Sequence, residues 1–282
     1  MRQTYTMPAT AQEKEEFIPF FHELIDAAFA VIGEKFLTGI HVDDKYNGTP
    51  VTEADKGAEL AMRRLIEKRF PAHGIFGEEF GVKEADEAVC GGVRYRWILD
   101  PVDGTRSFIT NSFLFGTLIA LERDDGQGFR PIISSISHAA AGVRTIGTLE
   151  QTTMRVATAS RSFERVLKVR PCASLSQATL LTTSHWTTSE QKGDSRMQKL
   201  IDRAKLYRTM GDCFGYFAVA SAGADIMIDP DLCYWDLAAL LPVVEGAGGV
   251  VTSMTGGNPL AELSAVCTAG GALHEEVLRL LA

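Results

Sequence analysis

Carboxylates gather at three places in the sequence where they could act together. Glu78 and Asp100 each follow a short apolar run that predicts a strand, and Asp236 stands at the start of a predicted helix. Carboxylate oxygens are hard ligands of the kind that Mg²⁺ prefers. If these side chains converge, their mutual repulsion would raise some of their pKa values or force them apart. Bound divalent cations would remove that conflict, so the three clusters predict a metal site.

The turn that begins at Asp100 has the sequence Asp-Pro-Val-Asp-Gly-Thr and is the most informative of the three. It offers the carboxylates of Asp100 and Asp103, a free carbonyl at Val102 and the hydroxyl of Thr105. Gly104 and Thr105 would also place backbone N–H groups at the start of a helix, where such groups can bind phosphate. One loop is therefore expected to bind both a cation and an anion.

The charge of the whole chain narrows the class of ligand. Twenty-eight lysines and arginines against thirty-six acidic residues give a net charge of −8, so no basic field attracts nucleic acid or an anionic membrane. Divalent cations would reverse the local potential and let this acidic protein bind a phosphate ester. Two of them could activate the attacking water and stabilise the leaving alkoxide. We expect a small phosphate ester as the ligand, with neither nucleic acid nor membrane as a partner.

Apolar periodicity indicates the elements that must hold these residues. Helical spacing predicts helices over 15–37 and 52–70, and Thr52 and Asp55 have the spacing of a capping box, which places Asp55 in the first turn of the second helix. Strands are predicted at 74–77, 95–99, 115–122, 130–137, 142–147 and 154–157. The last four are separated by turn-rich segments, which favours an antiparallel arrangement.

From about residue 180 the predicted strands and helices alternate, which favours an α/β second half. The predicted elements are strands 179–183, 224–228, 249–252 and 265–268 and helices 196–204, 214–222, 235–247 and 272–281. We expect an α+β half over 1–150 with most of the metal ligands, and an α/β half over 151–282 with Asp236 and the substrate contacts. No linker-like composition separates them, so the boundary is predicted to be a packed interface.

Cysteine usage and hydropathy suggest the compartment. The five cysteines are odd in number and never spaced as pairs that bind zinc, so reduced thiols are expected. The N-terminus has no apolar core of a signal peptide, and no apolar run reaches the length of a membrane span. The cytoplasm is the expected compartment.

Four segments in this order resemble the inositol monophosphatase-like family of Mg²⁺-dependent, lithium-sensitive phosphatases. They are Val-Thr-Glu-Ala-Asp at 51–55, Gly-Glu-Glu at 77–79, Asp-Pro-Val-Asp-Gly-Thr at 100–105 and Trp-Asp-Leu-Ala-Ala at 235–239. The resemblance runs from Phe17 to the C-terminus. It implies a sugar-phosphatase-like fold with αβαβα layers, α+β in its first half and α/β in its second, and a homodimer.

The resemblance also implies roles for particular residues. Two or three Mg²⁺ ions would be bound by Glu78, Asp100, the Val102 carbonyl, Asp103 and Asp236, and Asp55 with Thr105 would help to activate the water, with Glu78 beside them in the catalytic set. Taken alone, Asp236 would instead be an N-cap for a helix beginning near Leu237.

Three segments are similar to the histidinol-phosphatase branch of that family. They are Arg-Ser-Phe at 106–108, the strand-like run 115–121, and the segment 208–216 with Gly-Asp-Cys, in which Met210 is a departure. The branch implies L-histidinol phosphate, an intermediate of histidine biosynthesis, as substrate. Asp212 and Asp229 are then candidates to contact its cationic groups; the alternatives are a helix cap for Asp212 and a strand-ending turn for Asp229.

Two other functions stay open at this point. The same chemistry could act on inositol 1-phosphate, a sugar phosphate or a 3′-phosphonucleotide. A function of another class is a regulatory protein that binds a macromolecule and keeps a vestigial site. The complete set of acidic residues argues against the second alternative.

Overall fold

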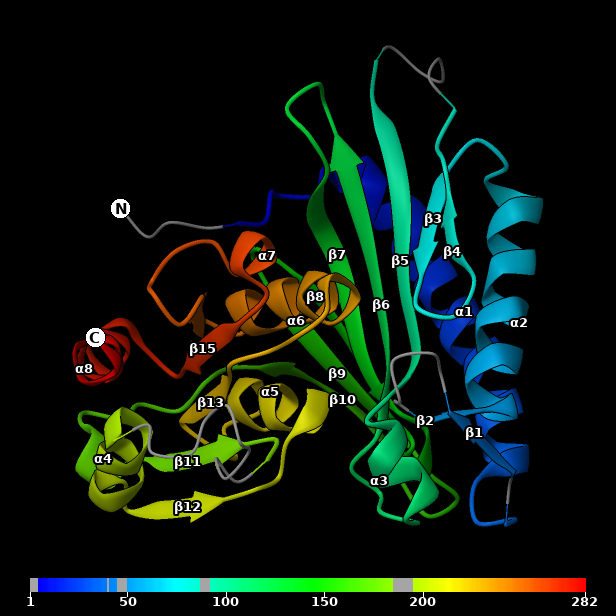
Figure 1. The fold of residues 1–282 in the computed structure, drawn as a ribbon. Helices are drawn as coiled ribbons and strands as arrows, with labels where there is room; N and C mark the ends of the chain where they lie inside the picture. The colour runs from blue at the N-terminus through cyan, green and yellow to red at the C-terminus, as the bar shows by residue number, and fades with distance from the viewer. Residues whose placement is uncertain (1–4, 40, 45–49, 87–91, 185–194) are drawn as a thin grey trace.

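A computed structural model describes residues 5–39, 41–44, 50–86, 92–184 and 195–282. Helices and sheets alternate in five layers (Figure 1). Helices α1 (Ala11–Lys35) and α2 (Glu53–Arg69) cover one face of a large sheet, and α5 (Asp212–Ala220) and α6 (Tyr234–Gly246) fill the space between this sheet and a smaller one. Helices α4 (Ser195–Arg203) and α8 (Gly271–Leu281) form the outermost layer. The predicted αβαβα fold is confirmed.

The large sheet has eight strands in the order β10-β9-β8-β7-β6-β5-β3-β4. Strands β3 and β5 are parallel, and the pairs from β5 to β10 are all antiparallel. The antiparallel arrangement predicted for the four strands that became β6 to β9 is confirmed. Its strands are β3 (Gly74–Gly77), β4 (Gly81–Lys83), β5 (Arg94–Asp103), β6 (Gly116–Asp124), β7 (Arg130–His138), β8 (Val143–Thr148), β9 (Thr152–Ala157) and β10 (Ser162–Leu167).

The smaller sheet has the order β12-β11-β13-β15-β14 and mixes parallel with antiparallel pairs. Its strands are β11 (Thr179–Thr182), β12 (Leu206–Arg208), β13 (Ile226–Asp229), β14 (Val250–Thr252) and β15 (Ala265–Thr268). The remaining elements are β1 (Val42–Asp44) paired with β2 (Pro50–Thr52), the short helices α3 (Thr105–Ile109) and α7 (Pro259–Glu262), and 3₁₀ turns η1 (Ala139–Ala141) and η2 (Leu175–Gln177).

The chain changes sheets after residue 150. Strands β9 and β10 still belong to the large sheet, and the smaller sheet begins with β11. Helix α6, from the second half of the chain, packs against the large sheet. The division at residue 150 stays a prediction, and the packing of α6 means that both halves of the chain share one interior.

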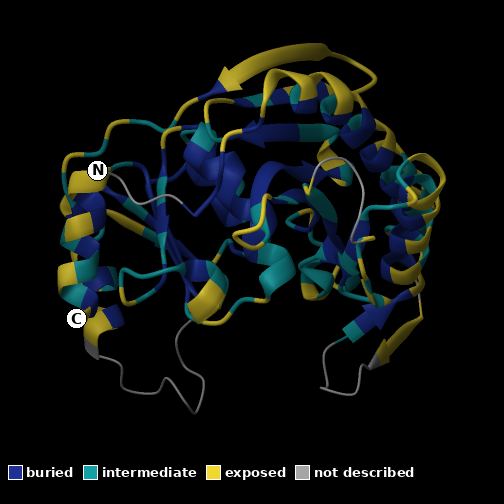
Figure 2. Cartoon of the chain, turned by 90° about the horizontal axis from the view of Figure 1, so that it is seen from above, coloured by how far each residue is buried: buried dark blue, intermediate teal, exposed yellow. Residues whose placement is uncertain are grey.

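Packing follows the periodicity of the sequence. Helix α1 buries Phe17, Phe21, Leu24 and Ala28 at helical spacing, and its exposed residues face outward (Figure 2). Burying each of the phenylalanine and leucine side chains contributes about 1.5–3 kcal/mol. None of the described helices combines the length and apolar character that crossing a membrane requires.

Several predicted boundaries differ from the observed ones, most of all at the start of α1 and at the end of β5. Helix α1 begins at Ala11 rather than residue 15, because Thr10 caps it and Glu13 completes a capping box. Strand β5 does not end at residue 99 but continues to Asp103. Strand β10 is missed altogether, because almost all its residues are exposed and show no apolar alternation.

The described cysteines are consistent with the sequence. Cys172, Cys213, Cys233 and Cys267 are all free thiols, as expected. Cys90 lies outside the described residues.

Candidate metal centre and active site

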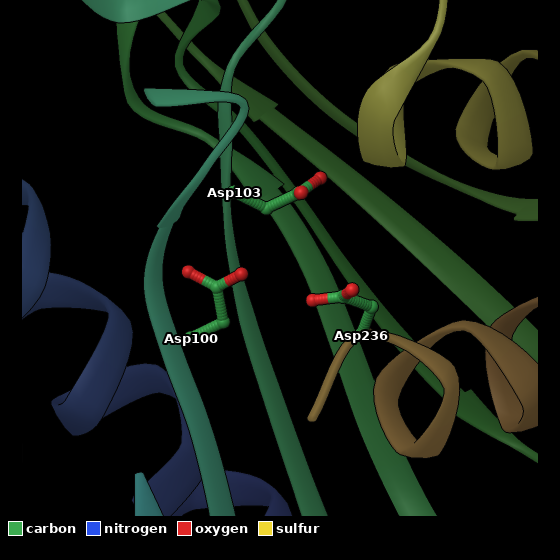
Figure 3. Close-up of side chains that lie close together, drawn as sticks. All are labelled: Asp100, Asp103 and Asp236. Atoms are coloured by element: carbon green, nitrogen blue, oxygen red, sulfur yellow. The ribbon is translucent and has the colours of Figure 1, made fainter. Parts of the chain in front are cut away.

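Three of the predicted metal ligands converge between the large sheet and α6. Asp100 and Asp103 come from the end of β5, and Asp236 comes from the first turn of α6 (Figure 3). One oxygen atom from each carboxylate lies within 4.8 Å of the other two. Residues more than 130 positions apart in the chain therefore form one acidic cluster.

An irregularity in β5 brings Asp100 and Asp103 to the same side. In a regular strand, residues three positions apart point to opposite faces. The register with β6 shifts between Asp100 and Asp103. Ile98 packs on the α6 side of the sheet, whereas Val102 packs with α1 and α2, so the alternation of faces changes between them. The turn is held by the Val102 N–H, which donates to Asp100 Oδ1 at 3.0 Å.

The carboxylate of Asp236 caps the start of α6 and also belongs to the acidic cluster. Helix α6 starts at Tyr234, and its N-cap is Cys233, so the expectation of an N-cap at Asp236 is wrong by three positions. As the third helical residue, Asp236 accepts the Cys233 N–H through Oδ2 at 2.8 Å. This bond is the backbone half of a capping box, and it fixes the carboxylate beside the aspartates of β5.

Burial and mutual repulsion act on all three carboxylates. Burial raises the pKa of Asp100 well above its ordinary value, and the charges of Glu78, Asp103 and Asp236 raise it further. Burial also raises the pKa of Asp103 well above its ordinary value, and the charges of Asp212 and Asp236 raise it further. Burial raises the pKa of Asp236 to about 7.

No lysine or arginine in the described part of the chain forms an ion pair with the cluster. The ion pairs formed among the described residues include none of Asp100, Asp103 and Asp236. These close oxygen ligands, of which Asp100 is buried and Asp103 and Asp236 are half-buried, have no described cationic partner and fit hard divalent cations such as Mg²⁺.

Glu78 lies beside the cluster because β3 pairs with β5. It follows β3, and its N–H donates to the Leu99 carbonyl at 3.0 Å, one residue before Asp100. Its charge is the largest electrostatic influence on Asp100 after burial. The sequence prediction that Glu78 lies with Asp100 is consistent with this arrangement.

Thr105 and Asp55 form the predicted pair beside the cluster. The Thr105 hydroxyl oxygen lies 3.1 Å from the Val102 carbonyl oxygen and 3.3 Å from Asp55 Oδ1. The other oxygen of Asp55 accepts the N–H of Thr52 at 2.8 Å and its hydroxyl at 2.6 Å, which completes the predicted capping box. Burial raises the pKa of Asp55. This chain of hydroxyl and carboxylate groups can hold and pass on a proton.

Two cavities adjoin the cluster. The larger, of about 470 Å³, is lined by Pro50, Glu78, Gly104, Thr105, Arg106, Ser107, Thr183, Ser184, Asp212, Cys233 and Trp235. The smaller, of about 180 Å³, is lined by Asp103, Thr183, Asp212, Cys213, Tyr216, Asp229, Asp231, Leu232, Asp236 and Leu240. Thr183 and Asp212 line both, so these two residues lie where the cavities meet.

Asp212 is not a helix cap. It is the first residue of α5, Gly211 is the N-cap, and the Asp212 side chain instead accepts the Ser107 hydroxyl at 3.2 Å. It also lies against Gly104, where an added Cβ would be 2.9 Å from Asp212 Oδ2. Gly104 has a φ of +80°, so both its conformation and this contact favour glycine.

Asp229 lies deeper. It ends β13 and is buried, and its oxygens accept the Thr183 N–H at 3.3 Å and the Tyr216 hydroxyl at 3.0 Å. Burial raises its pKa to about 7. Its side chain thus ties β11 and α5 together at the wall of the smaller cavity.

Sequence reasoning missed several residues of the site. Ser107 and Thr183 were given no role, although they hold Asp212 and Asp229. No local signal identifies such hydroxyls. Glu59 was also missed, and here a signal existed: it is an acidic residue on the buried face of α2, one turn after Asp55.

Comparison with known proteins agrees with the fold. The model of the inositol monophosphatase family matches residues 13–282. The bifunctional phosphatase IMPL2, chloroplastic, of Arabidopsis thaliana is 36% identical over 257 residues, which cover 91% of this chain and 70% of that protein. A histidinol-phosphatase of Chlorobaculum parvum is 34% identical over 85% of this chain and 86% of its own.

A solved inositol monophosphatase from Zymomonas mobilis superposes with a TM-score of 0.78 at 32% identity, covering 97% of this chain and 99% of that one. The family match spans nearly the whole chain and includes every residue of the acidic cluster. The protein therefore belongs to the inositol monophosphatase family.

Proposed function

We propose that this protein is a Mg²⁺-dependent phosphomonoesterase that hydrolyses L-histidinol phosphate to L-histidinol and phosphate. The observation that carries the substrate is the position of Asp212, a carboxylate outside the acidic cluster that lines the same cavity as Glu78 and Thr105. The similarity to a histidinol-phosphatase supports the same substrate.

The metal ligands proposed are Glu78, Asp100, Asp103, Asp236 and the Val102 carbonyl, which would hold two or three Mg²⁺ ions. When bound, Mg²⁺ supplies Lewis-acid stabilisation of charge on the ester and lowers the pKa of water. The protein's own part is to hold these oxygens close together in a buried place, against their mutual repulsion.

Thr105 and Asp55 are proposed to orient the attacking water and take up its proton. The hydroxyl of Thr105 has two acceptors within 3.3 Å, so its single proton can be directed toward either, and its oxygen can accept a hydrogen bond from water and take the water's proton as its own proton passes to Asp55. The backbone N–H groups of Gly104 and Thr105, at the start of α3, are proposed to bind the phosphate.

Asp212 and Asp229 are proposed to bind the cationic end of the substrate. Histidinol phosphate carries a protonated amine and an imidazole, which inositol phosphate lacks. Asp229 already accepts two hydrogen bonds, so its substitution would also disturb Thr183 and Tyr216. Asp212 provides the cleaner test, because the one hydrogen bond that its side chain makes with the described residues is that with the hydroxyl of Ser107.

A second candidate substrate is inositol 1-phosphate. The observation in its favour is the inositol monophosphatase of Zymomonas mobilis, whose identity to this chain is close to that of the histidinol-phosphatase. A macromolecule-binding protein with a vestigial site is less well supported, because the acidic cluster and the Thr105–Asp55 pair are both intact. The homodimer, the cytoplasmic location and the lithium inhibition remain predictions.

Phosphate release from histidinol phosphate, inositol 1-phosphate and p-nitrophenyl phosphate tests this proposal. We expect the wild type to prefer histidinol phosphate. A hydrogen bond to a charged group contributes about 1.5–3 kcal/mol, so Asp212→Asn should lower kcat/KM for that substrate about 10- to 150-fold and spare p-nitrophenyl phosphate.

Asp202→Asn, which removes an exposed carboxylate from α4, is the control for loss of charge and should change neither activity. A preference of the wild type for inositol 1-phosphate would overturn the substrate assignment. Equal losses with both substrates in Asp212→Asn would show that Asp212 supports the site without contacting the cation.

A further inference from the structure

We infer that Glu59 and Arg63 of α2 are positioning residues that hold Glu78 in the acidic cluster. The inference rests on the proposed role of Glu78 as a metal ligand. It concerns a buried ion pair that lies behind the site and lines neither of the two cavities beside the cluster.

Glu59 binds the backbone immediately after Glu78. Its side chain is fully buried, and its two oxygens accept successive N–H groups, that of Glu79 at 2.7 Å and that of Phe80 at 3.2 Å. The Glu78 N–H donates in the other direction, to the Leu99 carbonyl. The peptide units on the two sides of Glu78 are therefore anchored to different elements, α2 and β5.

Arg63 binds both Glu59 and the start of β4. It lies one helical turn after Glu59, its Nε donates to Glu59 Oε1 at 2.7 Å, and its guanidinium also donates to the Gly81 carbonyl. The pair thus contacts the last two residues of the turn between β3 and β4 and the first residue of β4. This turn carries Glu78, so its position depends on the geometry of the pair.

The close approach of Glu59 requires a glycine before Glu78. An added Cβ at Gly77 would lie 2.0 Å from Glu59 Oε1, far inside any tolerated contact. Asp55 lies one turn earlier on the same buried face of α2 and accepts the Thr105 hydroxyl. One helix face therefore sets the positions of both Glu78 and Thr105.

Stability alone is a weak explanation for this pair. A buried ion pair loses so much hydration that apolar residues of similar size often stabilise a protein equally well. Its hydrogen bonds, however, fix the direction of the backbone beside Glu78. Partners that orient metal ligands typically change metal affinity by about 10- to 100-fold when removed.

Calorimetric titration of Mg²⁺ into chelator-treated protein tests the inference without any turnover. Glu59→Gln keeps the size of the side chain but replaces one acceptor oxygen with an NH₂ group, so at least one of its three hydrogen bonds is lost. We expect its Kd for Mg²⁺ to rise about 10- to 100-fold. Arg63→Lys, which keeps the charge but loses the planar fork, should raise Kd in the same direction.

Glu13 provides a matched control. It is also a buried glutamate paired with an arginine, Arg123, at 2.8 Å, but it lies at the start of α1 and lines neither cavity at the cluster. Glu13→Gln should lower the melting temperature and leave the Kd for Mg²⁺ unchanged. Glu78→Gln is the reference for loss of the ligand itself.

The outcomes separate this inference from the proposed metal centre. If Glu78→Gln leaves the Kd for Mg²⁺ unchanged, the proposed ligand set is wrong and the inference fails with it. If Glu78→Gln weakens binding while folded Glu59→Gln and Arg63→Lys do not, the positioning role alone is overturned. An equal rise in the Kd for Mg²⁺ in Glu13→Gln would overturn it as well, because a general loss of stability would then explain the weaker binding.

Discussion

Asp236→Asn is expected to raise the stability of the metal-free protein and to reduce its stabilisation by Mg²⁺. The folded pKa of Asp236 is about 7, above its ordinary value of 3.8, because the carboxyl is buried and lies near Glu78. The protonated carboxyl therefore stabilises the folded state fully below about pH 4, and this contribution is lost as the pH rises through 7. Asparagine cannot ionise, so the variant avoids that loss, and it keeps an oxygen for the Cys233 N–H.

The magnitude follows from the two pKa values. Each pH unit between them corresponds to about 1.4 kcal/mol. Without metal, the free energy of unfolding of the variant should therefore exceed that of the wild type by up to about 4 kcal/mol at pH 8. For a chain of this size that is about 10 °C in melting temperature. With Mg²⁺ at one hundred times its Kd, the wild type should gain about 2.7 kcal/mol, and the variant should gain much less.

Thermal melting from pH 5 to pH 8, with chelator or with Mg²⁺, measures both effects. The metal-free wild type should lose stability across this range relative to Asp236→Asn, and the two curves should converge toward pH 4. Asp202→Asn on α4 is the control and should follow the wild type under all conditions. The reasoning is refuted if the difference between wild type and Asp236→Asn is independent of pH, or if Mg²⁺ stabilises both proteins equally.

The remaining predictions concern the reaction and the support of α6. Thr105→Ala should lower kcat by about 10²–10⁴-fold with a smaller change in KM, and steady-state kinetics showing mainly a KM effect would contradict its proposed role. Chelation should abolish phosphate release and Mg²⁺ should restore it, whereas Asp100→Asn should lose nearly all activity at any Mg²⁺ concentration; full turnover in excess chelator would exclude the metal mechanism. Tyr234→Phe removes the hydroxyl that donates to buried Glu122 and should cost about 1–3 kcal/mol in urea unfolding, and an unchanged midpoint would show that Arg96 alone satisfies that carboxylate.

Local sequence signals were sufficient to predict the bounds of several helices and strands. The capping box of Thr52 and Asp55 identified the start of α2, and β3 and β15 have the predicted bounds. These features are decided by neighbouring residues, through short-range hydrogen bonds and apolar periodicity. The order of the acidic segments, together with their residue types, also identified the family before any contact was known.

Contacts between residues far apart in the sequence decided the geometry of the site. The sequence could name Asp100, Asp103 and Asp236 as candidates, but only the register shift in β5 and the packing of α6 bring them within 4.8 Å. The contact of Asp212 with Ser107 joins segments 105 positions apart. The bonds from Glu59 to the turn after Glu78 join residues about 20 positions apart. Such contacts depend on how strands pair and helices cross, and these arrangements are set by the whole interior rather than by any one segment of the chain.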